Sequence, residues 1–111
     1  MQKLLTKELQ KKLPPLYSQD GKKAETVVYG HWFSCFNGWD FYATEYDEET
    51  GDMFGFVFGA APEMGYFNLA ELEEINRKYG LNYFEREANF TPKKVTEVPR
   101  IAEAFGYLWE K

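Results

Sequence analysis

The residues of this 111-residue chain that could do chemistry are few and widely spaced. It has one histidine, His31, and one cysteine, Cys35, four positions apart in a stretch that is typical of a β-strand. Four strand residues span about 13 Å, which is too far for a thiolate–imidazole pair. A lone histidine and a lone cysteine also lack the further ligands that a zinc site needs. The residue types therefore predict no catalytic centre, no metal and no cofactor.

Carboxylates near the histidine leave one enzymatic alternative open. Asp40 or Glu45 could work with His31 in a small enzyme of unknown type, although no catalytic motif accompanies them. Glu45 is expected at the rim of a sheet, because a buried carboxylate would need hydrogen-bond partners. The acidic stretch DEETGD (47–52) does not have the spacing of a calcium-binding loop, and its composition predicts a solvated hairpin loop.

An aromatic stretch raises the question of RNA binding. FGFVF (54–58) is close to the signature strand of RNA-recognition domains, in which rings stack on bases. The signature is incomplete, since acidic and apolar residues precede it where a basic residue and a glycine belong. The element order given below also differs from that of these domains. Phe54, Phe56 and Phe58 are therefore predicted to be core residues, and RNA binding through them is not expected.

Charge is distributed unevenly along the chain. Residues 1–23 carry six lysines and two acids, net +4, whereas residues 24–91 carry thirteen acids and three bases, net −10, and the whole chain is −5. A nucleic-acid-binding protein normally has a basic face, but here the aromatic strand lies in the acidic segment. The single cysteine is typical of the reducing cytoplasm, and no apolar run approaches the roughly 20 residues of a membrane helix. We predict a cytoplasmic protein with no membrane partner.

Periodicity and turn signals predict one α+β domain over residues 1–111, with a mainly antiparallel sheet of four to five strands and two to three helices. The predicted order, α-β-β-β-(β)-α-β-α, consists of a short helix after Thr6 that ends at Pro14, strands at 26–35, 39–46 and 53–60, a short strand at 65–68, a helix at 69–79, a strand at 81–87 and a C-terminal helix at 97–109. Asn68 and Gly80 are the expected caps of the helix at 69–79. Its buried face is expected to carry Leu72, Ile75 and Tyr79.

Turn chemistry predicts the register of the sheet. Asn37-Gly38 is a strong signal for a two-residue hairpin turn, which would pair Phe36 with Trp39. If the loop at 47–52 pairs Tyr46 with Met53, alternation places the three phenylalanines of FGFVF on one face. The opposite face then carries the candidate binding residues, Tyr29, His31, Tyr42, Thr44 and Tyr46.

Tyrosine-rich surfaces suit recognition, so this second face is a hypothesis for a binding surface. The structural alternative is that a helix covers it. In that case the binding surface is expected on the helix at 69–79 or on the loop at 47–52. A one-residue slip in the 47–52 connection would exchange the two faces of the third strand.

Four stretches resemble a known family: LLTKELQKKLPPLYSQDGK (4–22), FYATEYD (41–47), FGFVFG (54–59) and EMGYFNLAELEEI (63–75). Its members are small bacterial proteins, often encoded on plasmids and phages, which are catalogued as a domain of unknown function. The resemblance covers about residues 3–98, and it makes the helix at 97–109 an addition to a family-like core. It implies an accessory protein of a mobile element or phage, and it carries no catalytic residues.

Three functions follow as hypotheses. The first is a non-enzymatic factor that binds another protein, including an anti-defence factor whose acidic surface imitates DNA and occupies a nucleic-acid-binding protein. The second is a small enzyme at His31. The third is a nucleic-acid-binding protein, and its basic N-terminal helix would supply Lys3, Lys7, Lys11 and Lys12.

Overall fold

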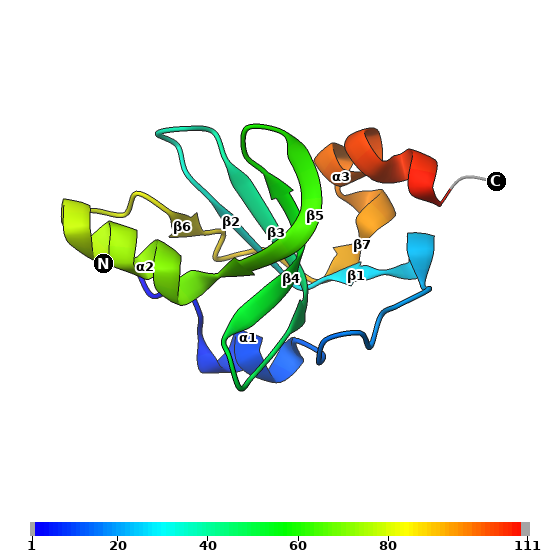
Figure 1. Cartoon of the computed structure of the whole chain (residues 1–111), viewed down its shortest axis with the longest axis horizontal. Helices are drawn as coiled ribbons and strands as arrows, with labels where there is room; N and C mark the ends of the chain where they lie inside the picture. Colours follow the sequence, from blue (N-terminus) through cyan, green and yellow to red (C-terminus); the bar gives the residue numbers. More distant parts are fainter. Residues whose placement is uncertain (1, 110–111) are drawn as a thin grey trace.

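The computed structural model describes residues 2–109 and confirms the predicted α+β class (Figure 1). In chain order, the elements are α1 (Lys7–Lys12), η1 (Lys23–Glu25), β1 (Val27–Val28), β2 (Gly30–Phe33), β3 (Asp40–Tyr46), β4 (Asp52–Phe58), β5 (Pro62–Asn68), α2 (Leu69–Tyr79), β6 (Glu85–Arg86), β7 (Lys93–Lys94), η2 (Val95–Glu97), α3 (Pro99–Phe105) and η3 (Gly106–Leu108), where η marks a 3₁₀ turn.

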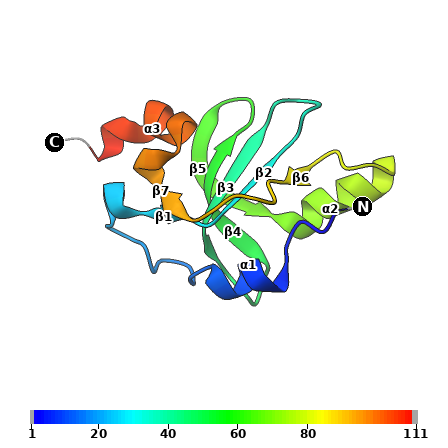
Figure 2. The same cartoon turned by 180° about the vertical axis from the view of Figure 1, so that it is seen from behind.

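A five-stranded antiparallel sheet forms the centre of the molecule, in the order β5-β4-β3-β2-β6. The short strands β1 and β7 pair separately beside it. Figures 1 and 2 show α2 and α3 at opposite ends of the long axis, with α1 along one side. Among residues 2–109, no helix has the length and apolar character needed to cross a membrane.

Local chemistry caps α1 and α2 as predicted, whereas the predicted C-terminal helix at 97–109 is the shorter α3 followed by η3. The Thr6 hydroxyl accepts a hydrogen bond from the backbone N–H of Leu9 at 3.1 Å, which caps α1. The side chain of Asn68 caps α2 in the same way, and Gly80 ends that helix with φ of 67°. These contacts lie within four residues of one another, so the sequence alone could predict them.

The predicted buried face of α2 is wrong at its last residue, because Tyr79 is 58% exposed. Asn76, one turn earlier, is buried instead. Its side-chain amide donates to the carbonyl of Phe84 at 3.0 Å and accepts from the N–H of Phe84 at 2.9 Å. A buried amide that satisfies both groups of a neighbouring backbone fixes the return of the chain from α2 to β6.

The predicted two-residue turn at Asn37-Gly38 is also wrong. Strands β2 and β3 pair Phe33 with Asp40, a register two residues away from the predicted one. Only Gly38 has a positive φ, of 75°, whereas a two-residue type I′ turn needs positive φ at both positions. The carbonyl of Ser34 accepts from the N–H of Gly38 at 2.9 Å and closes a wider turn. Because the shift is an even number, the side chains keep their predicted faces.

Strands β3 and β4 pair in the predicted register only next to their loop, where Tyr46 lies opposite Met53. A bulge at Thr44 shifts the rest by one residue, so that Phe56 lies opposite Tyr42. A shift of one residue reverses the face to which each side chain points. The predicted separation of the phenylalanines of β4 from Tyr42 is therefore wrong beyond the bulge.

Both faces of the sheet are covered, and two cores result. The first core contains Leu4, Leu13, Trp32, Phe41, Ala43, Met53, Phe67, Leu69, Leu72 and Phe84. The second core contains Val28, Tyr42, Phe56, Phe58, Val95, Val98, Ile101 and Phe105.

The second core decides how FGFVF is used. Phe56 and Phe58 are 3% and 2% exposed, which confirms their predicted burial, while Phe54 is only partly buried. The ring of Phe105 in α3 lies 5.1 Å from that of Phe56 and 5.9 Å from that of Phe58. Rings packed under a helix are not available to stack on bases.

Candidate functional site

The five residues predicted to bind a partner do not share one surface. Tyr29 and Tyr46 pack against the first core, whereas Tyr42 belongs to the second and is covered there. Thr44 is buried at the bulge, and its hydroxyl donates to the carbonyl of Phe54 at 3.0 Å. His31, the fifth, stacks on the Tyr42 ring with centroids 4.3 Å apart. The expectation that these residues form one common surface is therefore wrong. A binding role for each residue stays a prediction.

His31 lies at the centre of a charged cluster that joins three parts of the chain. Its Nε2 is 2.6 Å from Oδ1 of Asp40, and its Nδ1 is 2.6 Å from Oε1 of Glu87. Asp40 also forms an ion pair with Arg100 of α3. The sequence predicted Asp40 as a partner of His31 but missed Glu87, which lies 56 residues away and reaches the histidine through the pairing of β2 with β6.

This arrangement uses up the hydrogen-bonding capacity of the imidazole. In the imidazolium form the ring donates to both carboxylates, and in the neutral form it can donate to only one. Neither ring nitrogen is left for a substrate or a metal ion. The cluster instead links β2, β3, the residue after β6 and α3 to one another. Burial raises the pKa of the neighbouring Tyr42 hydroxyl to about 12, with a further increase from Asp40 that Arg100 opposes.

Glu45, expected at the rim of the sheet, is buried and only 4% exposed. Its two carboxylate oxygens accept from the backbone N–H groups of Tyr17 and Gln19, each at 2.9 Å. The side-chain amide of Gln19 in turn donates to the carbonyls of Val27 and Thr44. The bulge turns Glu45 inward, where these partners satisfy it, and the contacts fasten the segment after α1 to the sheet.

Next to this fastened segment lies a groove of about 1180 Å³ between α1 and the loop that joins β3 to β4. Its lining residues are Lys7, Gln10, Lys11, Leu13, Pro15, Leu16, Tyr17, Tyr46, Asp47, Glu48 and Glu49. We call this set the α1 groove. It includes part of the loop at 47–52 that the sequence predicted as the alternative binding surface.

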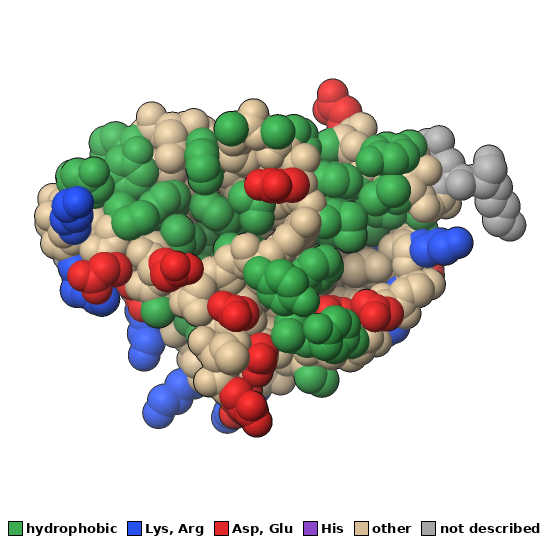
Figure 3. Space-filling model, in the orientation of Figure 1, with side chains coloured by type: hydrophobic (Ala, Val, Ile, Leu, Met, Phe, Trp, Pro, Cys, Tyr) green, Lys and Arg blue, Asp and Glu red, His purple; other side chains and the backbone are tan. Residues whose placement is uncertain are grey.

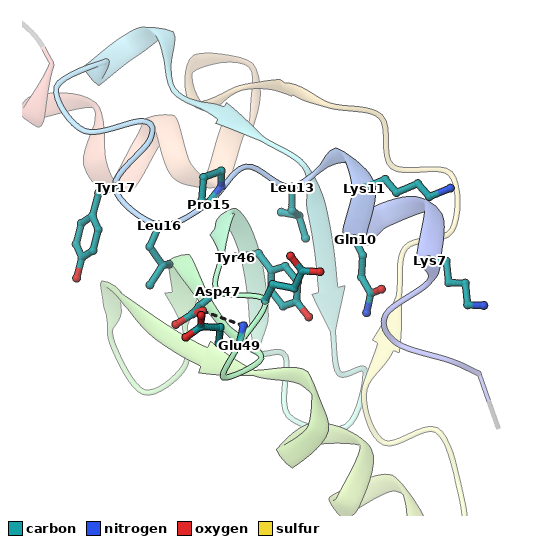
Figure 4. A pocket seen from close by; sticks show the side chains of 11 residues that line it. Lys7, Gln10, Lys11, Leu13, Pro15, Leu16, Tyr17, Tyr46, Asp47 and Glu49 are labelled. Atoms are coloured by element: carbon teal, nitrogen blue, oxygen red, sulfur yellow. Dashed lines mark hydrogen bonds between the residues drawn. The ribbon is translucent and has the colours of Figure 1, made fainter.

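The α1 groove has an apolar floor and an acidic rim. Figure 4 shows Leu13 and Tyr46 between α1 and the acidic loop and Leu16 on the segment after α1, with Lys7 and Lys11 extending from the outer side of α1. The loop is held by local contacts, because Oδ1 of Asp47 accepts from the N–H of Glu49 at 3.0 Å. Its carboxylates therefore stand at one rim of the groove, and the lysines stand at the far rim.

The charged groups of the α1 groove are available to a ligand. Within residues 2–109, Lys7, Lys11, Glu48 and Glu49 form no ion pair. The described residues also contain no group of three or more histidine, cysteine or carboxylate side chains that could hold a metal ion. The groove can therefore offer charge complementarity and apolar contact, and its residues do not form an acid–base or nucleophilic pair.

A family model described as a protein of unknown function, DUF2958, matches residues 4–108. The chain belongs to this family. The predicted resemblance to a family of unknown function is thereby confirmed, and the matched range contains the α1 groove, the His31 cluster and α3. No curated protein and no solved structure matches the chain.

Proposed function

We propose that the chain is a non-enzymatic accessory factor whose α1 groove binds a basic, partly apolar segment of another protein. The observation that carries the proposal is the acidic rim of Asp47, Glu48 and Glu49 beside an apolar floor that includes Leu13 and Tyr46. Carboxylates at a rim steer basic partners and select against acidic ones. A tyrosine at the floor offers a large contact area with few rotatable bonds.

The charged cluster supports a role other than catalysis. Both ring nitrogens of His31 are engaged by carboxylates, and the ring is stacked on Tyr42. A general base needs a free nitrogen within hydrogen-bond reach of its substrate. His31 does not line the α1 groove, so the one histidine and the acidic loop serve different parts of the molecule.

The proposed partner class is a basic surface of a nucleic-acid-binding protein. Residues 24–91 carry a net charge of −10, and Figure 3 shows acidic side chains spread over the visible face with basic ones at its margins. Such a surface competes with DNA for a basic site. From the resemblance to plasmid- and phage-borne proteins, we propose that this activity serves a mobile element against a host defence in the cytoplasm.

Nucleic-acid binding by α1 is the second candidate, and one observation favours it. The side chains of Lys7 and Lys11 extend from the outer side of α1, where phosphates could reach them without meeting the floor of the α1 groove. Lys12 is partly neutralised by Glu8 at 3.8 Å. The acidic loop on the other rim would repel a polynucleotide that entered the groove itself.

Affinity capture from a bacterial lysate with matched charge reversals tests the proposal. The variants are Glu49→Lys at the groove and Glu103→Lys on α3, both at exposed positions and both changing the net charge by the same amount. We expect the wild type and the Glu103→Lys variant to retain the same protein, and the Glu49→Lys variant to lose it about tenfold or more. Equal retention by all three would refute the groove as the binding site.

A second arm separates the two candidates. Fluorescently labelled DNA and RNA are titrated with the wild type and with a Lys7→Glu, Lys11→Glu variant at several salt concentrations. We expect no binding at physiological salt. Binding that weakens steeply with salt and disappears in the double variant would favour α1 as a nucleic-acid contact and overturn the protein-binding proposal.

A further inference from the structure

The strand β5 forms one edge of the sheet, and no other strand of the described chain pairs with its outer side. Open edges offer unpaired backbone groups to another strand, and proteins usually blunt them with lysines, bulges or short length. β5 has seven residues, no lysine and no shift of register against β4, and Pro62 blunts only its start. The opposite edge strand, β6, has two residues. β5 is therefore the edge that is open to strand addition.

Apart from Glu63, the exposed side chains of β5 are apolar. Met64 and Tyr66 are 46% and 53% exposed and point to the same face of the sheet. The Tyr66 ring packs against Phe54 with centroids 5.1 Å apart. Tyr17, 66% exposed, lies beside Tyr66 and raises the pKa of its hydroxyl. Figure 3, in which β5 faces the viewer, shows hydrophobic side chains gathered over this part of the surface.

Gly65, at the centre of β5, has no role that the single chain explains. A Cβ atom at this position would meet nothing within 4 Å, and its φ lies outside the left-handed region. Its cross-strand neighbour Gly55 is different, because a Cβ there would lie 1.8 Å from the carbonyl oxygen of Tyr42. A glycine inside a strand weakens it and often marks a place where another backbone approaches.

We propose that β5 pairs antiparallel with β5 of a second copy of this chain, with the two Gly65 residues opposite each other. Met64 then lies opposite Tyr66 of the second copy, and symmetry repeats the pair, so four exposed apolar side chains meet on one face. Glu63 is the only charged residue of β5. In this register the two Glu63 residues stay about 14 Å apart, beyond the Debye length of about 8 Å.

A pocket beside the strand supports a second copy as the occupant. It measures about 210 Å³, and Phe54, Met64, Leu108 and Trp109 contribute its apolar lining. Because Tyr66 of the second copy lies opposite Met64, its ring is in place to cover this pocket. Each copy thus supplies a pocket beside Met64 and a Tyr66 ring that covers the pocket of the other copy. The proposal does not rest on the proposed function, because the acidic loop of the α1 groove takes no part in it.

Sedimentation equilibrium over about 5 to about 200 µM protein measures this association directly. We expect the mass to rise from 13.0 kDa toward about twice that value, without weakening at high salt. Tyr66→Lys should stay monomeric, whereas Tyr79→Lys, at a tyrosine of similar exposure on α2, should associate like the wild type. A wild type that stays at 13.0 kDa throughout would overturn the proposal and leave the edge to a strand of a different protein.

Cysteine cross-linking tests the register. In a Cys35→Ser background, Gly65→Cys places two thiols opposite each other across the symmetry axis, within reach of a disulfide. Glu63→Cys is the control, since its mates lie about 14 Å apart. We expect Gly65→Cys to form covalent dimers at least about tenfold faster under mild oxidation. Equal rates would overturn the register, and neither substitution buries a new group in the single chain.

Discussion

Two glycines that lie opposite each other in the sheet should respond in opposite ways to the same substitution. In Gly55→Ala, the new Cβ would lie 1.8 Å from the carbonyl oxygen of Tyr42, and real Cβ atoms essentially never come closer than 3.0 Å to such an atom. The neighbour is backbone at the bulge, so it must move by more than an ångström. In Gly65→Ala, the new methyl group enters open space.

The expected magnitudes follow from these distances. Gly55→Ala forces the loss of the bulge or overpacking around it. Either change should lower the free energy of unfolding by about 3 kcal/mol or more. Gly65→Ala should raise it by about 0.5 kcal/mol, because alanine is better than glycine in a strand where φ permits it. The difference between the two variants is thus about 3.5 kcal/mol for the same change of one methyl group.

Urea unfolding at low micromolar protein measures both values. Trp32 is fully buried, so its fluorescence reports loss of the first core. With a slope near 1.5 kcal/mol per molar urea, Gly55→Ala should lower the midpoint by about 2 M or leave the protein unfolded. A midpoint within about 0.3 M of the wild type would refute the placement of the bulge. Equal losses for Gly55→Ala and Gly65→Ala would refute the argument from side-chain space.

Three further predictions concern the cores and the fastened segment. Phe56→Ala should lower the free energy of unfolding by about 3–5 kcal/mol, measured by the same urea titration, because the ring is buried under α3. Glu45→Gln should cost about 1–3 kcal/mol and speed hydrogen exchange at Tyr17 or Gln19, since an amide can accept only one of the two N–H bonds. Tyr42, whose pKa is raised to about 12, stabilises the fold below pH 10 and loses that contribution of about 3 kcal/mol as pH rises to 12. Comparing the wild type with Tyr42→Phe at about pH 9 and about pH 11.5 isolates it, and an equal loss in both would contradict the assignment.

The sequence predicted the features that depend on neighbours in the chain. Thr6, Asn68 and Gly80 each cap a helix through contacts with residues at most four positions away. Residue type and spacing were therefore enough to place α1 and α2. The approximate positions of β3 and β4 followed in the same way from β-branched and aromatic residues, whereas the predicted strand at 26–35 is divided into β1 and β2, and β7 was not predicted. The fold class could be predicted because these local signals agree with one another.

Features that depend on long-range packing could not be predicted in this way. The bulge at Thr44 has no marker in the sequence, yet one residue of slip moves Phe56 into the second core. Glu87 approaches His31 only because β6 pairs with β2. Nothing in the sequence around Glu45 indicates that the backbone N–H groups of Tyr17 and Gln19 satisfy its carboxylate. The predicted tyrosine-rich face therefore does not exist as one surface. Part of the loop at 47–52, the predicted alternative, lines the α1 groove.

The bulge also connects the two cores to the α1 groove. It turns Glu45 inward beside residues 17–19, and the carboxylate holds that segment by two hydrogen bonds. The next residue, Tyr46, donates its N–H to the carbonyl of Pro14 at 2.9 Å and forms part of the floor, and the acidic loop follows at once. Consecutive residues at the end of β3 and the start of the next loop thus set one wall, the floor and the acidic rim. A variant that loses the bulge must lose the groove with it, whereas loss of packing in the second core through Phe56 should leave the groove intact for as long as the chain is folded.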